Sequence, residues 1–236
     1  EALWQAAELH GKGGNRAASA KAYERYLKQY PEPFERAMET RHRLAVIAKA
    51  DGNAKRDFEL QREIFQADQR GGSARTERTR YLGAMAALAL AQPAVDDYKK
   101  VALVEPLQRS LKTKKAKLED ALKGYAVAAD YGVADASTAA TFHTAALYQD
   151  FGQAMLKSQR PKGLKKLELE QYNVLLEEQA FPFEEKAITL HEINAKRSAQ
   201  GVYDEWVSKS FAALRTLKPG RYARAERVEG VIDAIR

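Results

Sequence analysis

The sequence repeats itself at a fixed interval near its amino-terminal end. A Gly-Asn pair at 14–15 recurs 38 residues later at 52–53, and Leu27 recurs at the same interval as Phe65. Each pair lies between two stretches whose apolar residues recur at helical spacing. Self-similarity at this period is typical of stacked helix-turn-helix units, because each unit buries its apolar face only against its neighbours. We therefore expect an all-α protein built from antiparallel helix hairpins.

The composition fits this architecture. Hydrophobic residues make up 45% of the 236-residue chain and charged residues 30%, as in a folded rather than a disordered protein. Helix-favouring residues dominate segments that are too long for strands. We expect a single helical-repeat domain over residues 1–236, with 221–236 as its C-terminal capping segment. Because the chain starts without a methionine inside an expected helix, it is also expected to be the C-terminal fragment of a longer protein.

Helices are expected wherever apolar residues recur at helical spacing between glycine and proline turns. Ser137 is the expected N-cap of one helix, because its hydroxyl can accept a hydrogen bond from the first turn. The alanine-rich helix 75–91 is expected to lie closely between its neighbours. The expected ranges are 3–9, 16–30, 34–50, 54–69, 75–91, a helix beginning at 93, 107–131, 138–156, and a final helix through Trp206 and Leu214.

The segment 167–194 is expected to form two antiparallel helices joined by a tight corner. A Phe-Pro-Phe tripeptide at 181–183 interrupts its helical pattern. The residue before a proline is pushed out of the helical region, and proline suits the first turn of a new helix. We therefore expect the first helix to stop at the tripeptide and its two phenylalanines to hold the corner. Ala187, Ile188 and His191 are the expected buried stripe of the second helix.

The hairpins resemble the tetratricopeptide repeat (TPR) family, in which small residues, a turn glycine, an aromatic residue and a closing proline recur in each unit. Tyr26 departs from the pattern, and the second unit lacks the proline. The matching residues are Ala6, Ala7, Gly14, Ser19, Tyr23, Leu27 and Pro31 in the first unit, Ala94, Tyr98, Val101 and Pro106 in the third, and Gly201, Trp206, Ala213, Leu214 and Pro219 in the last. The resemblance implies an α-α superhelix, a solenoid with a concave groove.

A narrower resemblance covers residues 137–222. The strings LYQDFGQAMLKSQRPKGLKKLELEQYNVLLEEQAFPFEEKAITLHEIN and GVYDEWVSKSFAALRTLKPGRY are similar to the C-terminal part of bacterial repeat proteins that accompany TonB-type energy-transduction and gliding-motility systems. This resemblance implies a periplasmic scaffold whose partner is a cell-envelope energy-transduction or motility component. A cytoplasmic location remains the alternative.

The TPR resemblance also implies which residues face the groove. Solenoids of this kind bind peptides or partner domains with side chains of the first helix of each hairpin. Carried over by register, the groove residues are Trp4 and Glu8 in the first unit, His42, Val46 and Lys49 in the second, and His191, Ala195 and Ser198 in the last. We therefore expect a non-catalytic scaffold that binds a protein or peptide.

No catalytic or metal-binding set emerges from the sequence. The chain lacks cysteine, and its four histidines fall in separate helices. His191-Glu192 begins like a zinc-protease motif, but position 195 is alanine, so the second histidine is missing. Gly11-Lys12-Gly13-Gly14 lacks the preceding strand and the Gly-Lys-Ser/Thr end of a phosphate-binding loop. We expect no enzyme activity, no metal and no cofactor.

The net charge of +7 leaves nucleic-acid binding as an alternative function. Basic residues concentrate in 99–123, where Lys112, Lys114, Lys115 and Lys117 form an expected basic patch. Tyr98 and Tyr125 fall on the apolar stripe, so exposed aromatics for stacking bases are lacking and this alternative is less favoured. The longest apolar run, 83–95, is far shorter than the about 20 residues that span a bilayer.

Overall fold

A computed structural model describes residues 1–224, and all regular structure in that range is helical. This confirms the all-α prediction. The helices are α1 (Ala2–Lys12), α2 (Arg16–Gln29), α3 (Phe34–Ala50), α4 (Ala54–Arg70), α5 (Glu77–Leu90), α6 (Gln92–Lys100), α7 (Leu107–Ala129), α8 (Ala134–Leu156), α9 (Lys166–Arg197), α10 (Glu205–Leu217) and α11 (Pro219–Tyr222), with short 3-10 turns at Gly72–Ala74 and Ser198–Gln200.

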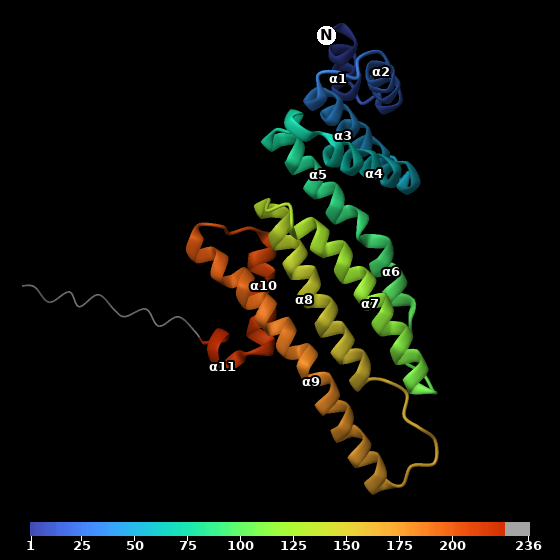
Figure 1. The fold of residues 1–236 in the computed structure, drawn as a ribbon, viewed down its shortest axis with the longest axis vertical. Coiled ribbons are helices and arrows are strands. Elements are labelled where there is room, and N and C mark those ends of the chain that lie inside the picture. The colour runs from blue at the N-terminus through green and yellow to red at the C-terminus, as the bar shows by residue number, and fades with distance from the viewer. Residues whose placement is uncertain (225–236) are drawn as a thin grey trace, which may run out of the picture.

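Successive helices pack side by side along an elongated molecule (Figure 1). Helices α1 to α4 form two hairpins at one end, and α5 contacts both α3 and α4. Helix α6 continues nearly in line with α5, and α7, α8 and α9 run beside this rod toward the other end. Helix α10 packs against α8 and α9. Each helix thus buries its apolar side mainly against helices that are close to it in the sequence.

The two Gly-Asn turns of the sequence repeat have the same geometry. Gly14 and Gly52 have positive φ angles of 78° and 70°, which glycine adopts without steric cost. The side chains of Asn15 and Asn53 each accept a hydrogen bond from the backbone N–H three residues on, and so cap α2 and α4. The repeat seen in the sequence therefore corresponds to two equivalent helix hairpins.

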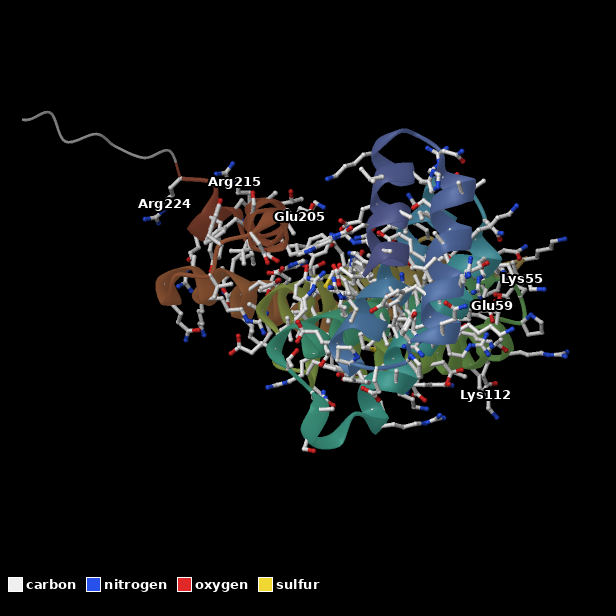
Figure 2. The ribbon with its side chains drawn as sticks, turned by 90° about the horizontal axis from the view of Figure 1, so that it is seen from above. Lys55, Glu59, Lys112, Glu205, Arg215 and Arg224 are labelled. Atoms are coloured by element: carbon white, nitrogen blue, oxygen red, sulfur yellow. The ribbon has the colours of Figure 1, made fainter. Side chains whose placement is uncertain are left out.

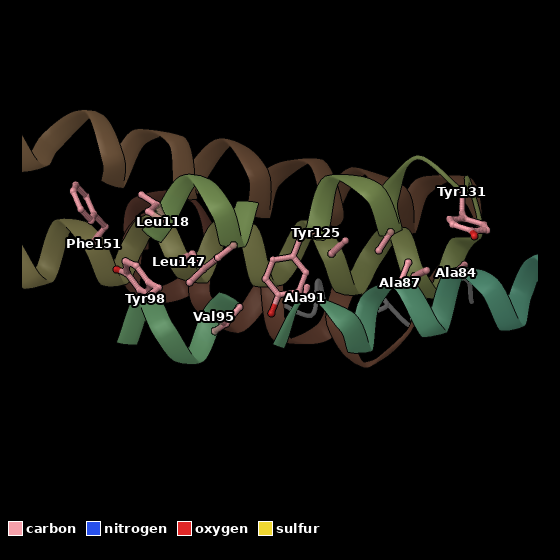
Figure 3. Close-up of a cluster of buried hydrophobic side chains, with 14 of the residues drawn as sticks. Ala84, Ala87, Ala91, Val95, Tyr98, Leu118, Tyr125, Tyr131, Leu147 and Phe151 are labelled. Carbon is pink, nitrogen blue, oxygen red and sulfur yellow. The ribbon is translucent and has the colours of Figure 1, made fainter. Parts of the chain in front are cut away.

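Small side chains allow α5 to approach its neighbours closely. The main core contains Ala84, Ala87 and Ala91 beside the larger Tyr98, Tyr125 and Phe151, which fill the space between the helices (Figure 3). A Cβ atom at Gly124 of α7 would lie 2.9 Å from the Cβ of Ala91, so this crossing requires glycine. The expectation that helix 75–91 lies closely between neighbours is confirmed.

The expected corner at 181–183 is wrong, because α9 continues through Pro182 as one helix of 32 residues. Its buried residues lie on one helical face on both sides of the proline, from Leu176 and Ala180 to Ala187. That face packs along α8, which is itself 23 residues long. Packing over this length outweighs the missing backbone hydrogen bond and ring clash, which cost about 3 kcal/mol. Phe181 is exposed and does not pin two helices together.

One further expectation differs from the structure, and another falls largely outside the described residues. Ser137 lies inside α8, which begins at Ala134, and its hydroxyl donates to the carbonyl of Ala129 rather than capping the helix. The short helix α11 reaches into the expected capping segment 221–236 with its last two residues, Arg221 and Tyr222. The remainder of that segment, beyond residue 224, lies outside the described residues.

Replacing Pro182 with alanine should stabilise the protein. Pro182→Ala restores the missing backbone donor and relieves the ring clash, so the free energy of unfolding should rise by up to about 3 kcal/mol in urea denaturation. Pro93→Ala is the matched control, because Pro93 lies in the first turn of α6, where proline is tolerated. An equal effect of both substitutions would contradict the continuous α9.

Candidate partner-binding groove

Three hollows lie along α1, α3 and α5. The first, of about 610 Å³, lies over α1 and α3 and reaches Arg78 of α5. The second, of about 310 Å³, lies between α1, α2 and α3. The third, of about 390 Å³, is lined by residues of α3, α4 and α5, together with Gln92 of α6, Tyr125 of α7 and His143 of α8. We call these three hollows together the groove.

The hollows are neighbours, because they share lining residues. Glu8 and Arg43 line both the first and the second hollow, and Val46 lines both the second and the third. Helix α3 supplies the shared residues Arg43 and Val46, so it contributes to all three hollows. An elongated ligand that lies along α3 could therefore contact each of them.

Five of the predicted groove residues line these hollows. Trp4 and Glu8 line the first, although Trp4 is only 5% exposed and lies under the guanidinium of Arg36 at 4.4 Å from its ring centre. His42, Val46 and Lys49 line the third. These residues of α1 and α3 therefore lie at neighbouring hollows.

His191, Ala195 and Ser198 do not line the groove hollows. His191 and Ala195 are buried, and the Ser198 hydroxyl donates to the carbonyl of Ala195. The error follows from the continuous α9. Without a corner at 181–183, His191 and Ala195 belong to the same helix as Leu176 and Ala180. The His191 ring lies 5.4 Å from that of Phe142 on α8, and Ala195 packs with Leu214 of α10.

His143 is a groove residue that the sequence analysis missed. Its ring stacks on Tyr125 at 5.2 Å and lies 4.7 Å from the Trp206 ring, so residues of α7, α8 and α10 meet at the end of the third hollow. Burial lowers the pKa of His143, and the charges of Lys209 and Lys99 lower it further. No local motif could have identified this site, because the aromatic partners of His143 come from two other helices, α7 and α10.

The third hollow combines an apolar floor with polar groups at its edge. Val46, Leu82 and Met85 supply apolar surface. His42 and Lys49 stand at the same hollow, and burial lowers the pKa of His42 as it does that of His143. Both imidazoles are therefore neutral near pH 7, and each can donate one hydrogen bond and accept another. Such a hollow suits one apolar side chain flanked by peptide groups.

The predicted basic patch is only partly at the surface. Lys112 and Lys115 are exposed, and Figure 2 shows Lys112 pointing away from the body. Lys114 is only 4% exposed, and its ammonium donates to the carbonyls of Tyr98 and Val101. Lys117 lies 3.8 Å from Asp97. Lys114 thus supports the end of α6 rather than contributing to a surface charge.

Comparisons with known proteins found no match: no family model, no curated protein and no solved structure is similar to this chain. Among residues 1–224, no three histidine, aspartate or glutamate side chains gather in a way that could hold a metal ion. None of the described helices is both long and apolar enough to cross a membrane. The groove geometry is therefore the main guide to function.

Lys114 should contribute to stability and its neighbours should not. Lys114→Met leaves the carbonyls of Tyr98 and Val101 without their donor and removes a cation 4.0 Å from the Tyr98 ring centre, so unfolding should require about 1–3 kcal/mol less. Lys115→Met is the control and should change stability by less than about 0.5 kcal/mol. Chemical denaturation measures both, and similar effects would place Lys114 at the surface.

His191 should make the fold sensitive to acid. Both its ring nitrogens lack a hydrogen-bond partner among the described residues, and burial lowers its pKa to about 4. Between pH 6.5 and 4 the unfolded chain binds the proton more readily, so stability should fall as the pH falls, by on the order of 3 kcal/mol. His191→Leu should remove this part of the pH dependence in denaturation curves, whereas the control His10→Leu, at an exposed histidine, should retain it.

Proposed function

We propose that the protein is a non-catalytic scaffold that binds a partner protein or peptide in the groove along α1, α3 and α5. The observation that carries the proposal is the row of three neighbouring hollows, which share the lining residues Glu8, Arg43 and Val46. Such a row of open hollows fits an extended polypeptide better than it fits a small substrate, which is usually held in one enclosed cavity.

The proposal includes a TPR-like superhelix. Its support is that several helices contact a helix further along the chain as well as the next one: α3 contacts α5, α5 contacts α8, and α8 contacts α10. In a solenoid of hairpins, the first helices of successive units contact one another in this way and form the inner surface. The units are then α1–α2, α3–α4, α5–α7, α8–α9 and α10–α11, with α6 as an added segment in the third.

The bound segment would place a large apolar side chain in the third hollow, against Val46, Leu82 and Met85. Buried apolar anchors dominate the binding energy of such interfaces, while the polar edge fixes orientation. The arginines of the first hollow are already engaged: Arg43 and Arg78 lie 3.2 Å and 2.8 Å from Glu39 carboxylate oxygens. Specificity should therefore come mainly from the third hollow.

The narrower resemblance suggests the setting of this scaffold. We propose a periplasmic protein of a bacterial cell-envelope assembly, with an energy-transduction or motility component as partner. Nucleic-acid binding is not favoured, because Lys114 is buried and Lys100, Lys117 and Lys123 each lie within 3.8 Å of an aspartate. Those contacts reduce the charge available to phosphates.

Site-specific crosslinking tests the groove. A photoreactive amino acid in place of Val46, which is exposed, should crosslink the natural partner in intact cells. The same residue in place of Val104, which is equally exposed but outside the groove, should give no such product. Equal crosslinking from both positions would overturn the proposal.

A substitution in the third hollow should weaken capture of the crosslinked partner. The double variant Val46→Asp with Lys49→Glu places negative charge in the third hollow. The affinity should fall at least about tenfold, since one buried anchor residue is worth about 2 kcal/mol or more and about 1.4 kcal/mol corresponds to a factor of ten. The matched control is Val104→Asp with Lys115→Glu, which makes the same chemical changes outside the groove. Isothermal calorimetry with the purified partner measures both variants.

A further inference from the structure

An apolar stripe runs along the outer face of α9. Leu167, Val174 and Phe181 recur every seven residues, which places them on one side of the helix. Their side chains are 66%, 54% and 61% exposed, whereas the opposite side of the helix packs into the protein through Leu176 and Ala180. The stripe extends over about 21 Å, the rise of 14 helical residues.

Carboxylates flank this stripe on both sides. Glu170, Glu177 and Glu184 lie three residues after its members, and Glu178 and Glu185 lie four residues after. Residues 167–185 contain six glutamates and no lysine or arginine. Within the described residues, no ion pair joins these carboxylates to a cation. The face is thus strongly acidic, although the whole chain has a net charge of +7.

A hollow of about 190 Å³ opens beside the stripe, between α8 and α9. Gly152, Leu156, Ala180 and Phe181 give it apolar walls, and Glu177 and Glu184 stand at its edge. One apolar side chain from outside could enter it, and a cation on the same ligand would meet the two carboxylates. The hollow thus shows the same combination of apolar surface and negative charge as the stripe.

A second copy of α9 would not complement this surface. In an antiparallel pair with Leu167 against Phe181 and Val174 against itself, Glu170 would face Glu178 of the other copy. Like charges so placed are destabilising. A helix with lysines and arginines beside its own apolar stripe would instead pair each carboxylate with a cation, as charge pairs beside the apolar seam do in coiled coils.

We propose that the outer face of α9 is a second docking surface, and that it binds a basic amphipathic helix of a partner protein. The apolar residues of that helix pack on Leu167, Val174 and Phe181, with one side chain in the hollow beside Phe181. Its lysines and arginines pair with the carboxylates on either side. This surface shares no residue with the groove, so the proposal does not depend on the proposed function.

A designed peptide tests the surface directly. The probe is a fluorescent helical peptide of about 21 residues, with leucines on one face and lysines on both sides of them. It should bind the full chain in an anisotropy titration, and binding should weaken as the ionic strength rises from about 0.05 to about 0.5 M. A peptide of the same composition with the leucines spread over all faces should bind at least about tenfold more weakly.

Paired variants separate the apolar and charged contributions. The double variant Val174→Ser with Phe181→Ser should weaken probe binding at least about tenfold. The double variant Glu177→Gln with Glu184→Gln should reduce the salt dependence of probe binding. Two control variants make the same kinds of change elsewhere on the exposed surface and should leave probe binding unchanged. They are Val104→Ser with Val127→Ser, and Glu119→Gln with Asp120→Asn. Circular dichroism checks that each variant is folded.

Three results would overturn the proposal. The first is equal binding of the ordered and the spread peptide. The second is a dimer in sedimentation analysis that Val174→Ser with Phe181→Ser dissociates, which would assign the stripe to a second copy. The third is clearly tighter probe binding by a chain that ends at Arg224, which would assign the stripe to the protein's own residues 225–236.

Discussion

The packing of α9 along α8 determines the architecture of the C-terminal half. It keeps α9 helical through Pro182, whose ring would otherwise favour a break. It buries His191 and Asn194, and the Asn194 side chain donates to the carbonyl of Thr138 on α8 and to Ser210 on α10. It also turns Phe181 toward solvent. The buried stripe, the position of α10 and the exposed face of α9 all follow from this one contact.

Local chemistry made the N-terminal half predictable from sequence. A glycine with positive φ followed by an asparagine cap specifies a helix hairpin without help from distant residues, so the turns at 14–15 and 52–53 could be assigned from sequence. The corner at 181–183 could not be judged in this way. Whether proline breaks a helix depends on how much packing lies on either side, and that packing involves α8, whose alignment with α9 is not encoded locally.

The contrast between local chemistry and packing between distant segments also explains which site residues could be foreseen from the sequence. His42, Val46 and Lys49 lie on one face of one helix, so register alone placed them together. The position of His143 at the third hollow could not be foreseen, because it depends on helices from distant parts of the sequence meeting there. The burial of Lys114 could not be foreseen either, because its sequence context is the same as that of the neighbouring lysines. Its burial depends on Tyr98, whose hydroxyl donates to Asp150 at 2.7 Å and whose carbonyl accepts from Lys114. Such networks join residues that no spacing rule connects.

The groove and the stripe on α9 use opposite chemistry. The third hollow has an apolar floor, two neutral imidazoles and a lysine, so the proposed peptide would bind there mainly through one buried side chain and backbone hydrogen bonds. The stripe has apolar side chains between carboxylates that form no ion pair within residues 1–224, so the proposed binding there would depend strongly on charge and on salt. Two surfaces with no residue in common can be occupied together, and a scaffold that holds two different partners at once requires this arrangement.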